Sequence, residues 1–259
     1  MSLIMSIYLN DGVVMASDSR ITITTETKSE GTTLINSFPF SDSTFKTFVA
    51  PNQCGISTCG ASSYKNKPIS GYIEKFLLSE IKEKTTVKEL ADKIADYFTN
   101  LDDNNITIFH VCGYTISQGN EYQLELYRCL TGKNNNVELI DTSSQGAYWD
   151  GEVDTLKKLI HPSICNPSII GEIQYKKNDE ETIDSIVISK ADLEYYSQSD
   201  IPWNLMTIAE AVDFINFAFT TTINDMKFKS VSKTVGGPIN ILAIKPSGPE
   251  WIKKNSYKD

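Results

Sequence analysis

Alternation of apolar and polar residues predicts a strand at the start of the chain. Leu3, Met5, Ile7 and Leu9 share one face of an extended segment, and the turn Asn-Asp-Gly at 10–12 leads into a second apolar run. Two apolar runs joined by Asp-Gly are typical of a β-hairpin, because these residues accept the φ angles of a tight turn. We therefore expect the chain to open with two paired strands.

Further strands and helices are predicted along the rest of the chain from the period of the apolar positions. Extended segments are expected at 21–24, 45–50, 53–59, 106–115, 123–129, 136–140 and 239–244. Helices are expected at 72–82, 87–101 and 207–225, and another is expected to start directly after Gly60. The second of these helices begins at a capping box, in which Thr86 precedes the helix and Glu89 lies in its first turn, and this pair satisfies free N–H groups of that turn.

Three stretches have no clear apolar period. The polar segment 25–43, rich in Thr and Ser, is expected as a long inserted surface loop, and 150–201 as a mixture of helices and loops. The tail from about 247 is expected to be solvated. The order of strands, two helices, strands, helices and a closing strand indicates an α+β fold of one domain over 1–259. Two antiparallel sheets with helices on both outer faces accommodate this order.

Composition narrows the choice of partners. The chain has 24 basic and 33 acidic side chains, a net charge of −9, and 40% hydrophobic residues. An acidic surface repels phosphates, so we expect no nucleic acid and no membrane as a partner. No stretch approaches the roughly 20 apolar residues of a membrane span. The segment 1–7 lacks a secretory signal's cationic start and cleavage site, so a cytoplasmic location is expected.

The cysteines support the same location. They are odd in number, widely spaced and mostly set among apolar neighbours, which is typical of reduced core thiols in a reducing compartment. They are Cys54, Cys59, Cys112, Cys129 and Cys165.

Three polar residues stand out as candidates for chemistry. Ser2 becomes the first residue when Met1 is removed, which is expected because serine is small. Asp18 ends the second strand, sixteen residues after Ser2, and Lys46 lies within an apolar strand. Each has a structural alternative: Ser2 can simply begin a strand, Asp18 can serve a turn, and Lys46 can be a solvated edge lysine.

The residues around these candidates resemble a known family. The run Val-Val-Met-Ala-Ser-Asp-Ser-Arg at 13–20 resembles the second strand of proteasome-type N-terminal nucleophile (Ntn) hydrolases. Fourteen residues after Lys46 comes Gly60, in a run Ser-Thr-Cys-Gly-Ala at 57–61 that is similar to the family's turn into its first helix. The run Val-Gly-Gly-Pro-Ile-Asn at 235–240 is similar to the entry to its last strand.

The resemblance implies a four-layer αββα sandwich and a site. Ser2 would attack an amide bond of a peptide or small amide, and its own α-amine, with a pKa of about 8, would accept the proton. Lys46 would lower the effective pKa of the hydroxyl, Asp18 would orient Lys46, and the N–H of Gly60 would face the oxyanion. No cofactor is implied, and a homo-oligomer is expected.

The family also orients the amine with a Ser-Gly pair and an Asp-x-x-Ser-Gly-Gly run. The corresponding segments here are Ser-Gln-Gly at 144–146 and Ser-Lys-Thr-Val-Gly-Gly at 232–237, which lacks the Asp. Ser144, Gln145 or Ser232 would therefore orient the amine.

Two other functions stay open from the sequence. The missing Asp and the long insertion favour a catalytically inert structural or interaction subunit with the same fold. A conventional hydrolase or binding module would use His110 or His161, the two histidines of the chain. However, His110 lies on a predicted buried strand, where we expect a core histidine with both ring nitrogens satisfied.

Overall fold

The computed structural model describes residues 2–29, 32–116, 119, 121–160, 172–176, 183–187, 201–229 and 232–255. The chain divides into two compact units, a main unit of Met1–Val153 with Pro202–Asp259 and a second unit of Asp154–Ile201. The sequence predicted one domain over 1–259, whereas the structure separates 154–201 from the rest. The second unit contains α3 (Asp154–Ile160), β13 (Glu172–Lys176) and β14 (Ile183–Val187).

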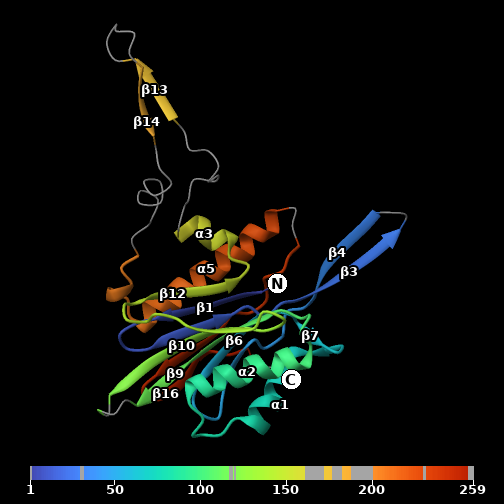
Figure 1. Ribbon diagram of the computed structural model, residues 1–259, viewed down its shortest axis with the longest axis vertical. Coiled ribbons are helices and arrows are strands. Elements are labelled where there is room, and N and C mark those ends of the chain that lie inside the picture. Colours follow the sequence, from blue (N-terminus) through green and yellow to red (C-terminus); the bar gives the residue numbers. More distant parts are fainter. Residues whose placement is uncertain are drawn as a thin grey trace. The chain divides into compact units, whose positions relative to one another are not determined.

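Two five-stranded antiparallel sheets form the centre of the main unit (Figure 1). The first sheet has the order β12 (Gly146–Gly151), β1 (Leu3–Tyr8), β2 (Val13–Ser17), β15 (Asn240–Lys245) and β16 (Gly248–Lys253). The second sheet has the order β11 (Asn136–Leu139), β10 (Tyr122–Leu130), β9 (Thr107–Ile116), β6 (Gly55–Gly60) and β5 (Thr47–Val49). The two sheets contact each other through β1 and β2 on one side and β6 on the other.

The predicted opening hairpin is confirmed. Strands β1 and β2 pair from Ile4 opposite Ser17 to Tyr8 opposite Val13. The N–H of Leu9 closes the turn with a hydrogen bond of 2.8 Å to the Gly12 carbonyl. Both strands are buried on both faces, since one face meets helix α5 and the other meets the second sheet.

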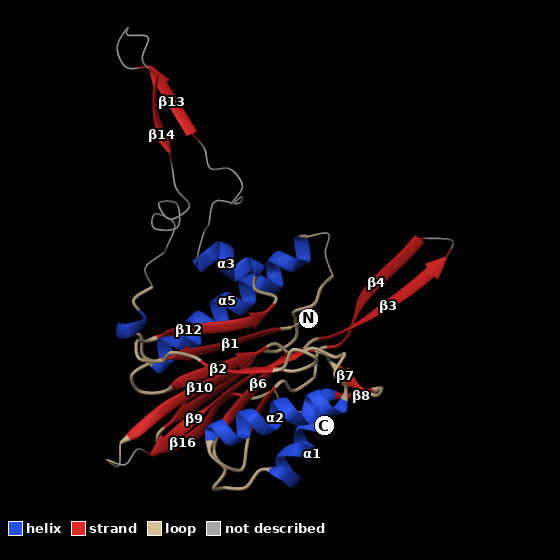
Figure 2. Ribbon diagram, in the orientation of Figure 1, coloured by secondary structure: helices blue, strands red, loops and turns tan. Residues whose placement is uncertain are grey.

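Helices cover the outer faces of the sheets (Figure 2). On the second sheet, α2 (Val87–Leu101) contacts β9, β10 and β11, and α1 (Ile69–Glu80) shares its core. On the first sheet, α5 (Ile208–Phe228) contacts β1 and β2, and the short η1 (Trp203–Leu205) contacts β12. The capping box of Thr86 and Glu89 is present. The α+β fold is therefore compatible with the predicted sandwich.

Three expectations are corrected by pairing that the sequence pattern does not reveal. The segment 25–43 lies mostly in a hairpin of β3 (Ile21–Ser29) and β4 (Thr32–Ser41), not in a loop, because its Thr-rich halves pair with each other. Gly60 is followed by the small hairpin of β7 (Ser63–Tyr64) and β8 (Lys67–Pro68) before α1 begins.

The tail is the third correction. Residues 248–253 form β16, which pairs with β15 at the edge of the first sheet. The segment alternates only weakly, and backbone hydrogen bonds to β15 rather than an apolar face make it a strand. In the segment 150–201, where helices and loops were expected, the structure also has the end of β12 and the strands β13 and β14.

No helix in the described part of the chain has the length and apolar character needed to cross a membrane.

We expect Phe98→Ala to destabilise the main unit by about 3–5 kcal/mol, since it empties a fully buried site in α2. The Phe98 ring packs 4.9 Å from the Phe109 ring and 5.2 Å from the Tyr64 ring. Denaturant unfolding followed by circular dichroism measures the change. Leu78→Ala, at an α1 residue that is 84% exposed, is the control and changes the unfolding free energy by less than about 0.5 kcal/mol.

Candidate active site

Ser2, Asp18 and Lys46 meet at one end of the space between the sheets. The Lys46 Nζ donates one hydrogen bond to Ser2 Oγ and one to Asp18 Oδ1, each 2.8 Å long. Ser2 is 6% exposed, Lys46 is 4% exposed and Asp18 is fully buried. The structure therefore joins three of the site residues that the sequence singled out in one hydrogen-bonded group.

Each of the three lies beside the end of a strand. Ser2 precedes β1, and Asp18 follows β2, where its N–H extends the ladder to the Leu3 carbonyl. Lys46 precedes β5, and its carbonyl accepts a hydrogen bond of 2.9 Å from the N–H of Thr58. Because Ser2 and Asp18 belong to the first sheet and Lys46 to the second, the lysine side chain spans the two sheets.

The Lys46 ammonium has an acceptor for each of its donors. Its third hydrogen bond, 2.5 Å long, goes to the carbonyl oxygen of Arg20. A lysine ammonium has three N–H donors and no acceptor, so the set of Ser2, Asp18 and Arg20 saturates it. A buried cation is stable only when it is paired and hydrogen-bonded in this way. Lys46 is thus a fixed positive charge against the Ser2 hydroxyl.

The Asp18 carboxylate is held by backbone N–H groups as well as by Lys46. The N–H of Leu3 donates to its Oδ1 at 3.2 Å, and the N–H groups of Arg20 and Gly236 donate to Oδ2, each at 3.1 Å. These donors stabilise the carboxylate charge and fix its orientation. Asp18 also ties the strand carrying Ser2 to the segment that leads into β15.

Ser19 and Arg20 also bind the segment 233–238, which leads into β15. The Ser19 hydroxyl donates to the Pro238 carbonyl at 2.5 Å. The Arg20 guanidinium binds the Asp42 carboxylate through two hydrogen bonds of 2.6 and 2.7 Å and also donates to two carbonyls of 233–235. The hydrogen bond from Arg20 holds the pKa of Asp42 below its ordinary value. Ser19 and Arg20, the last two residues of the run that resembles the family motif, thus attach the end of that run to the segment before β15.

The backbone of Ser2 is held by the end of β12, which the sequence analysis missed. The N–H of Glu152 donates a hydrogen bond of 2.8 Å to the Ser2 carbonyl. Gly151 has φ of +97° and passes so close that a Cβ there would overlap the Ser2 carbonyl oxygen. Only glycine fits such an approach. The Asp-Gly pair at 150–151, directly after Tyr148 and Trp149, was the available signal.

Two expected amine-orienting residues lie elsewhere. Strand β12 runs antiparallel to β1, with Gly146 opposite Tyr8 and Gly151 opposite Leu3, so the segment before β12 lies at the far end from Ser2. There the Gln145 side chain donates to Asn10 in the β1–β2 turn. The expectation for Gln145 and its neighbour Ser144 was therefore wrong, because the motif does not indicate how β12 pairs with β1. Orientation by Ser232 stays a prediction.

Gly60 borders a small cavity at this site. Its φ is +107°, and a Cβ would lie 2.6 Å from the Ile106 carbonyl oxygen, so the position requires glycine. Ser2, Lys46 and Thr58 also line the cavity, whose volume of about 10 Å³ has room for one water molecule. Gly60 therefore lies beside the nucleophile candidate, and the direction of its N–H toward an oxyanion stays a prediction.

His110 is confirmed as a buried histidine with both ring nitrogens hydrogen-bonded. Its Nδ1 lies 3.0 Å from Ser6 Oγ and its Nε2 lies 3.1 Å from Asp150 Oδ2. Arg128 donates two hydrogen bonds to the same carboxylate, of 2.8 and 3.0 Å. Ser6, His110 and Asp150 thus form a Ser-His-Asp chain, but Ser6 is fully buried and cannot reach a substrate. This arrangement argues against a conventional triad at His110.

The Cys59 thiol is buried near charged groups: Asp150 and Asp18 raise its pKa, and Lys46 lowers it, but burial has the largest effect. Burial chiefly raises the pKa of the Cys59 thiol, so the thiol stays protonated as a small apolar group. Burial alone would also raise the pKa of Asp150, but hydrogen bonds from His110 and Arg128 outweigh it and leave that pKa below its ordinary value.

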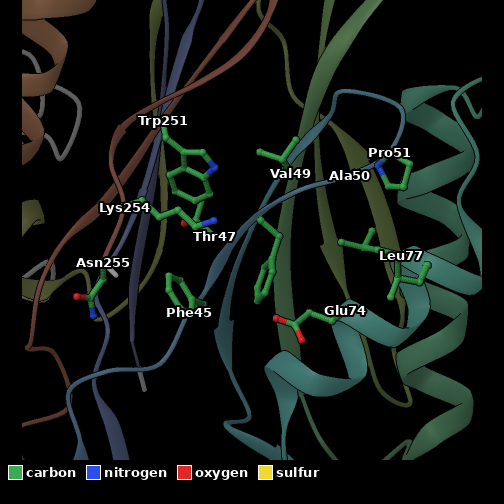
Figure 3. A pocket seen from close by; sticks show the side chains of 12 residues that line it. Phe45, Thr47, Val49, Ala50, Pro51, Glu74, Leu77, Trp251, Lys254 and Asn255 are labelled. Atoms are coloured by element: carbon green, nitrogen blue, oxygen red, sulfur yellow. The ribbon is translucent and has the colours of Figure 1, made fainter. Parts of the chain in front are cut away.

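A larger cavity of about 860 Å³ lies beside the edge strands β5 and β16, and Ser2 does not line it. Phe45, Val49, Leu77 and Trp251 give it apolar walls, and Figure 3 shows the Lys254 side chain between the two aromatic rings. The Lys254 Nζ lies 5.9 Å from the centre of the Phe45 ring and 5.2 Å from that of Trp251. These contacts are cation–π interactions and carry no reactive group.

Within the described ranges, no group of three or more His, Cys, Asp or Glu side chains could hold a metal ion. Four cysteines, Cys54, Cys59, Cys112 and Cys129, are free and buried, as predicted. Met1, His161 and Cys165 lie outside the described residues.

Comparisons with known proteins bear on the fold. No family model matches the sequence, and no curated protein matches it. The structure is similar to the Anbu (Gly-1) mutant from Hyphomicrobium sp. strain MC1, with a TM-score of 0.50 and 12% identity over 98% of this chain and 86% of that one. Eukaryotic HslV from Trypanosoma brucei is also similar, with a TM-score of 0.41 and 11% identity over 94% of this chain and 99% of that one. The likeness to Anbu supports a proteasome-like fold.

We expect Asp18→Asn to lower the free energy of unfolding by about 3–5 kcal/mol, because it leaves the buried Lys46 ammonium without its anion. Urea denaturation of both proteins measures the difference. Asp92→Asn removes one partner of the exposed Lys88–Asp92 pair, whose N–O distance is 2.7 Å, and costs less than about 0.5 kcal/mol. Equal effects of the two substitutions would contradict the buried pairing.

The lowered pKa of Asp150 predicts a pH dependence of stability. A carboxyl whose pKa is lower in the folded than in the unfolded state contributes stability above its unfolded pKa, about 3.9, and loses it as the pH falls through the folded value. Asp150→Asn removes this contribution, so its unfolding free energy should fall less steeply between about pH 5 and pH 2 than that of the wild type. Parallel pH curves would contradict the assignment.

Proposed function

We propose that this chain is an N-terminal serine amide hydrolase of the proteasome-like Ntn class, active after Met1 is removed. The observation that carries the proposal is the buried hydrogen-bonded chain from Asp18 through Lys46 to the hydroxyl of Ser2. The hydroxyl belongs to the residue whose backbone nitrogen becomes a free amine when Met1 leaves. The likeness to Anbu supports the same Ntn sandwich.

The first step forms an acyl-enzyme. Ser2 Oγ attacks the carbonyl carbon of the substrate amide, and the α-amine of Ser2 accepts the hydroxyl proton directly or through a water molecule. The carbonyl electron pair moves to oxygen, where the N–H of Gly60 stabilises the oxyanion. The C–N bond then breaks, and the α-ammonium returns the proton to the leaving amine.

The second step releases the acid. The α-amine accepts a proton from a water molecule, whose oxygen attacks the ester carbonyl. The C–O bond to Ser2 breaks, Oγ takes back the proton, and a carboxylic acid leaves. Each step uses the amine once as base and once as acid, so the site regenerates itself.

Lys46 does not serve as the base in this mechanism. Because it pairs with the Asp18 carboxylate at 2.8 Å and donates to the Arg20 carbonyl, we assign it as an ammonium, which has no lone pair to accept the hydroxyl proton. Its positive charge instead stabilises the alkoxide that develops on Ser2 Oγ, and Asp18 holds that charge in place. The base must then be another group next to Oγ, and the α-amine meets this condition.

The substrate class is a peptide or a small amide, and the protein acts in the cytoplasm as a homo-oligomer without a cofactor.

A fluorophosphonate probe tests the proposal. Ser2 Oγ attacks phosphorus and fluoride leaves, so intact-protein mass spectrometry detects the adduct on a chain that lacks Met1. We expect Ser2→Ala to abolish labelling, and Lys46→Met to slow it by about 10²–10³-fold, because the charge that stabilises the alkoxide is lost. Ser62→Ala, at another serine lining the cavity, is the matched control and keeps the wild-type rate.

Two outcomes would reject catalysis. One is quantitative retention of Met1 on protein isolated from its native host, which blocks the amine. The other is equal labelling of wild type and Ser2→Ala. In either case the inert structural subunit becomes the better description, since the buried Lys46–Asp18 pair then only joins the two sheets.

A further inference from the structure

The backbone of Ser2 depends on a short segment that is itself anchored from the opposite sheet. The Ser2 carbonyl accepts its hydrogen bond from Glu152, directly after Gly151. Asp150, the next residue back along the chain, pairs with Ile4 in the register of β12 on β1. The position of the nucleophile is therefore linked through two peptide units to the Asp150 side chain.

Asp150 is fixed by side chains of the second sheet. His110 on β9 and Arg128 on β10 lie directly opposite each other in the strand register. Arg128 gives the carboxylate two hydrogen bonds, of 2.8 and 3.0 Å, and His110 Nε2 lies 3.1 Å from it. Since an ionised carboxylate only accepts, both residues act as donors. The Asp150 side chain is 13% exposed, so solvent hardly competes.

A second connection returns from His110 to the strand of the nucleophile. The other ring nitrogen, Nδ1, lies 3.0 Å from the hydroxyl of Ser6 on β1, four residues after Ser2. His110 thus touches both first-sheet strands that flank the nucleophile, β12 through Asp150 and β1 through Ser6. The closed circuit contains only buried or mostly buried groups.

Such a circuit matters because the reacting groups come from different sheets. Apolar contacts between sheets are non-directional and leave the sheets free to shift by fractions of an ångström, whereas hydrogen bonds fix distance and angle. Ser2 lies on the first sheet, and Lys46 reaches it from the second. Any shift of one sheet against the other changes the Nζ–Oγ distance of 2.8 Å.

We propose that Asp150, clamped by His110 and Arg128, is a positioning residue that holds Ser2 against Lys46 by fixing the register of the two sheets. This inference rests on the proposed function, since it concerns the geometry of the same nucleophile. Asp150 touches no reacting atom in this role. It acts through Gly151 and Glu152 on the Ser2 carbonyl.

The test separates the maximal labelling rate from probe affinity, using the full chain after Met1 removal and the fluorophosphonate probe. In Asp150→Asn the maximal rate constant should fall about 10- to 100-fold, as for a misplacement of roughly 1 Å or less. The half-saturating probe concentration should change less than about twofold, because the side chains that line the cavity are untouched. Arg128→Lys, which keeps the charge but loses the paired donors, should give an intermediate rate.

A destabilised variant outside the circuit serves as a control, because it shows how much loss of stability alone changes the labelling rate. Ile73→Ala empties a fully buried site in α1, on the helix side of the second sheet, and lowers the melting temperature without touching the circuit. Its maximal labelling rate should match that of the wild type at a temperature where both proteins are folded. If Asp150→Asn does not fold, Arg128→Lys and Ser6→Ala make the same comparison.

The outcomes distinguish the two proposals. Wild-type protein that is never labelled at Ser2 overturns the proposed function and this inference with it. Labelling of the wild type with an unchanged maximal rate in Asp150→Asn and Arg128→Lys overturns only the positioning role. A rate lowered equally in Ile73→Ala would also overturn it, because general loosening would then explain the effect.

Discussion

The buried ammonium of Lys46 is the constraint on which the site and much of the main unit depend. A cation with 4% exposure requires acceptors for all its N–H groups, and the chain provides the Ser2 hydroxyl, the Asp18 carboxylate and the Arg20 carbonyl. Ser2 and Asp18 adjoin strands of the first sheet, Arg20 follows them along the chain, and Lys46 adjoins β5 of the second sheet. The two sheets are therefore joined by an electrostatic contact at the same point where the proposed chemistry occurs.

Around this contact the space between the sheets is unusually polar. Thr47 donates to Ser17 at 2.8 Å and lies 3.2 Å from Ser57, and the His110 circuit continues the polar belt away from Ser2. Buried hydrogen bonds of this kind contribute less to stability than to a unique arrangement, since each is worth only about 1 kcal/mol net. Among the described residues, one apolar core lies between the second sheet and its helices, and another joins the two sheets.

The candidate site could be predicted to a considerable extent from the sequence because its main residues sit beside strand ends. Strand alternation and the motif at 13–20 pointed to Asp18, and an apolar strand made Lys46 conspicuous. The prediction that Ser144 or Gln145 orients the amine was wrong because a Ser-Gln-Gly motif does not indicate strand direction. In the structure, the direction of β12 places Gln145 beside Asn10. The segment that does hold Ser2, at 150–152, is marked in the sequence only by the Asp-Gly pair at 150–151.

Local pattern by itself determined the opening hairpin, the capped helix at Thr86 and the α+β order, because these depend on neighbours within a few residues. The hairpin of β3 and β4 and the edge strand β16 were decided by pairing partners, since polar strands carry no apolar period of their own. Likewise the approach of Gly151 to Ser2, and of Lys46 to Asp18 from another sheet, arose only from tertiary structure. Hydrogen bonds between residues far apart in the chain leave no periodic trace in the sequence.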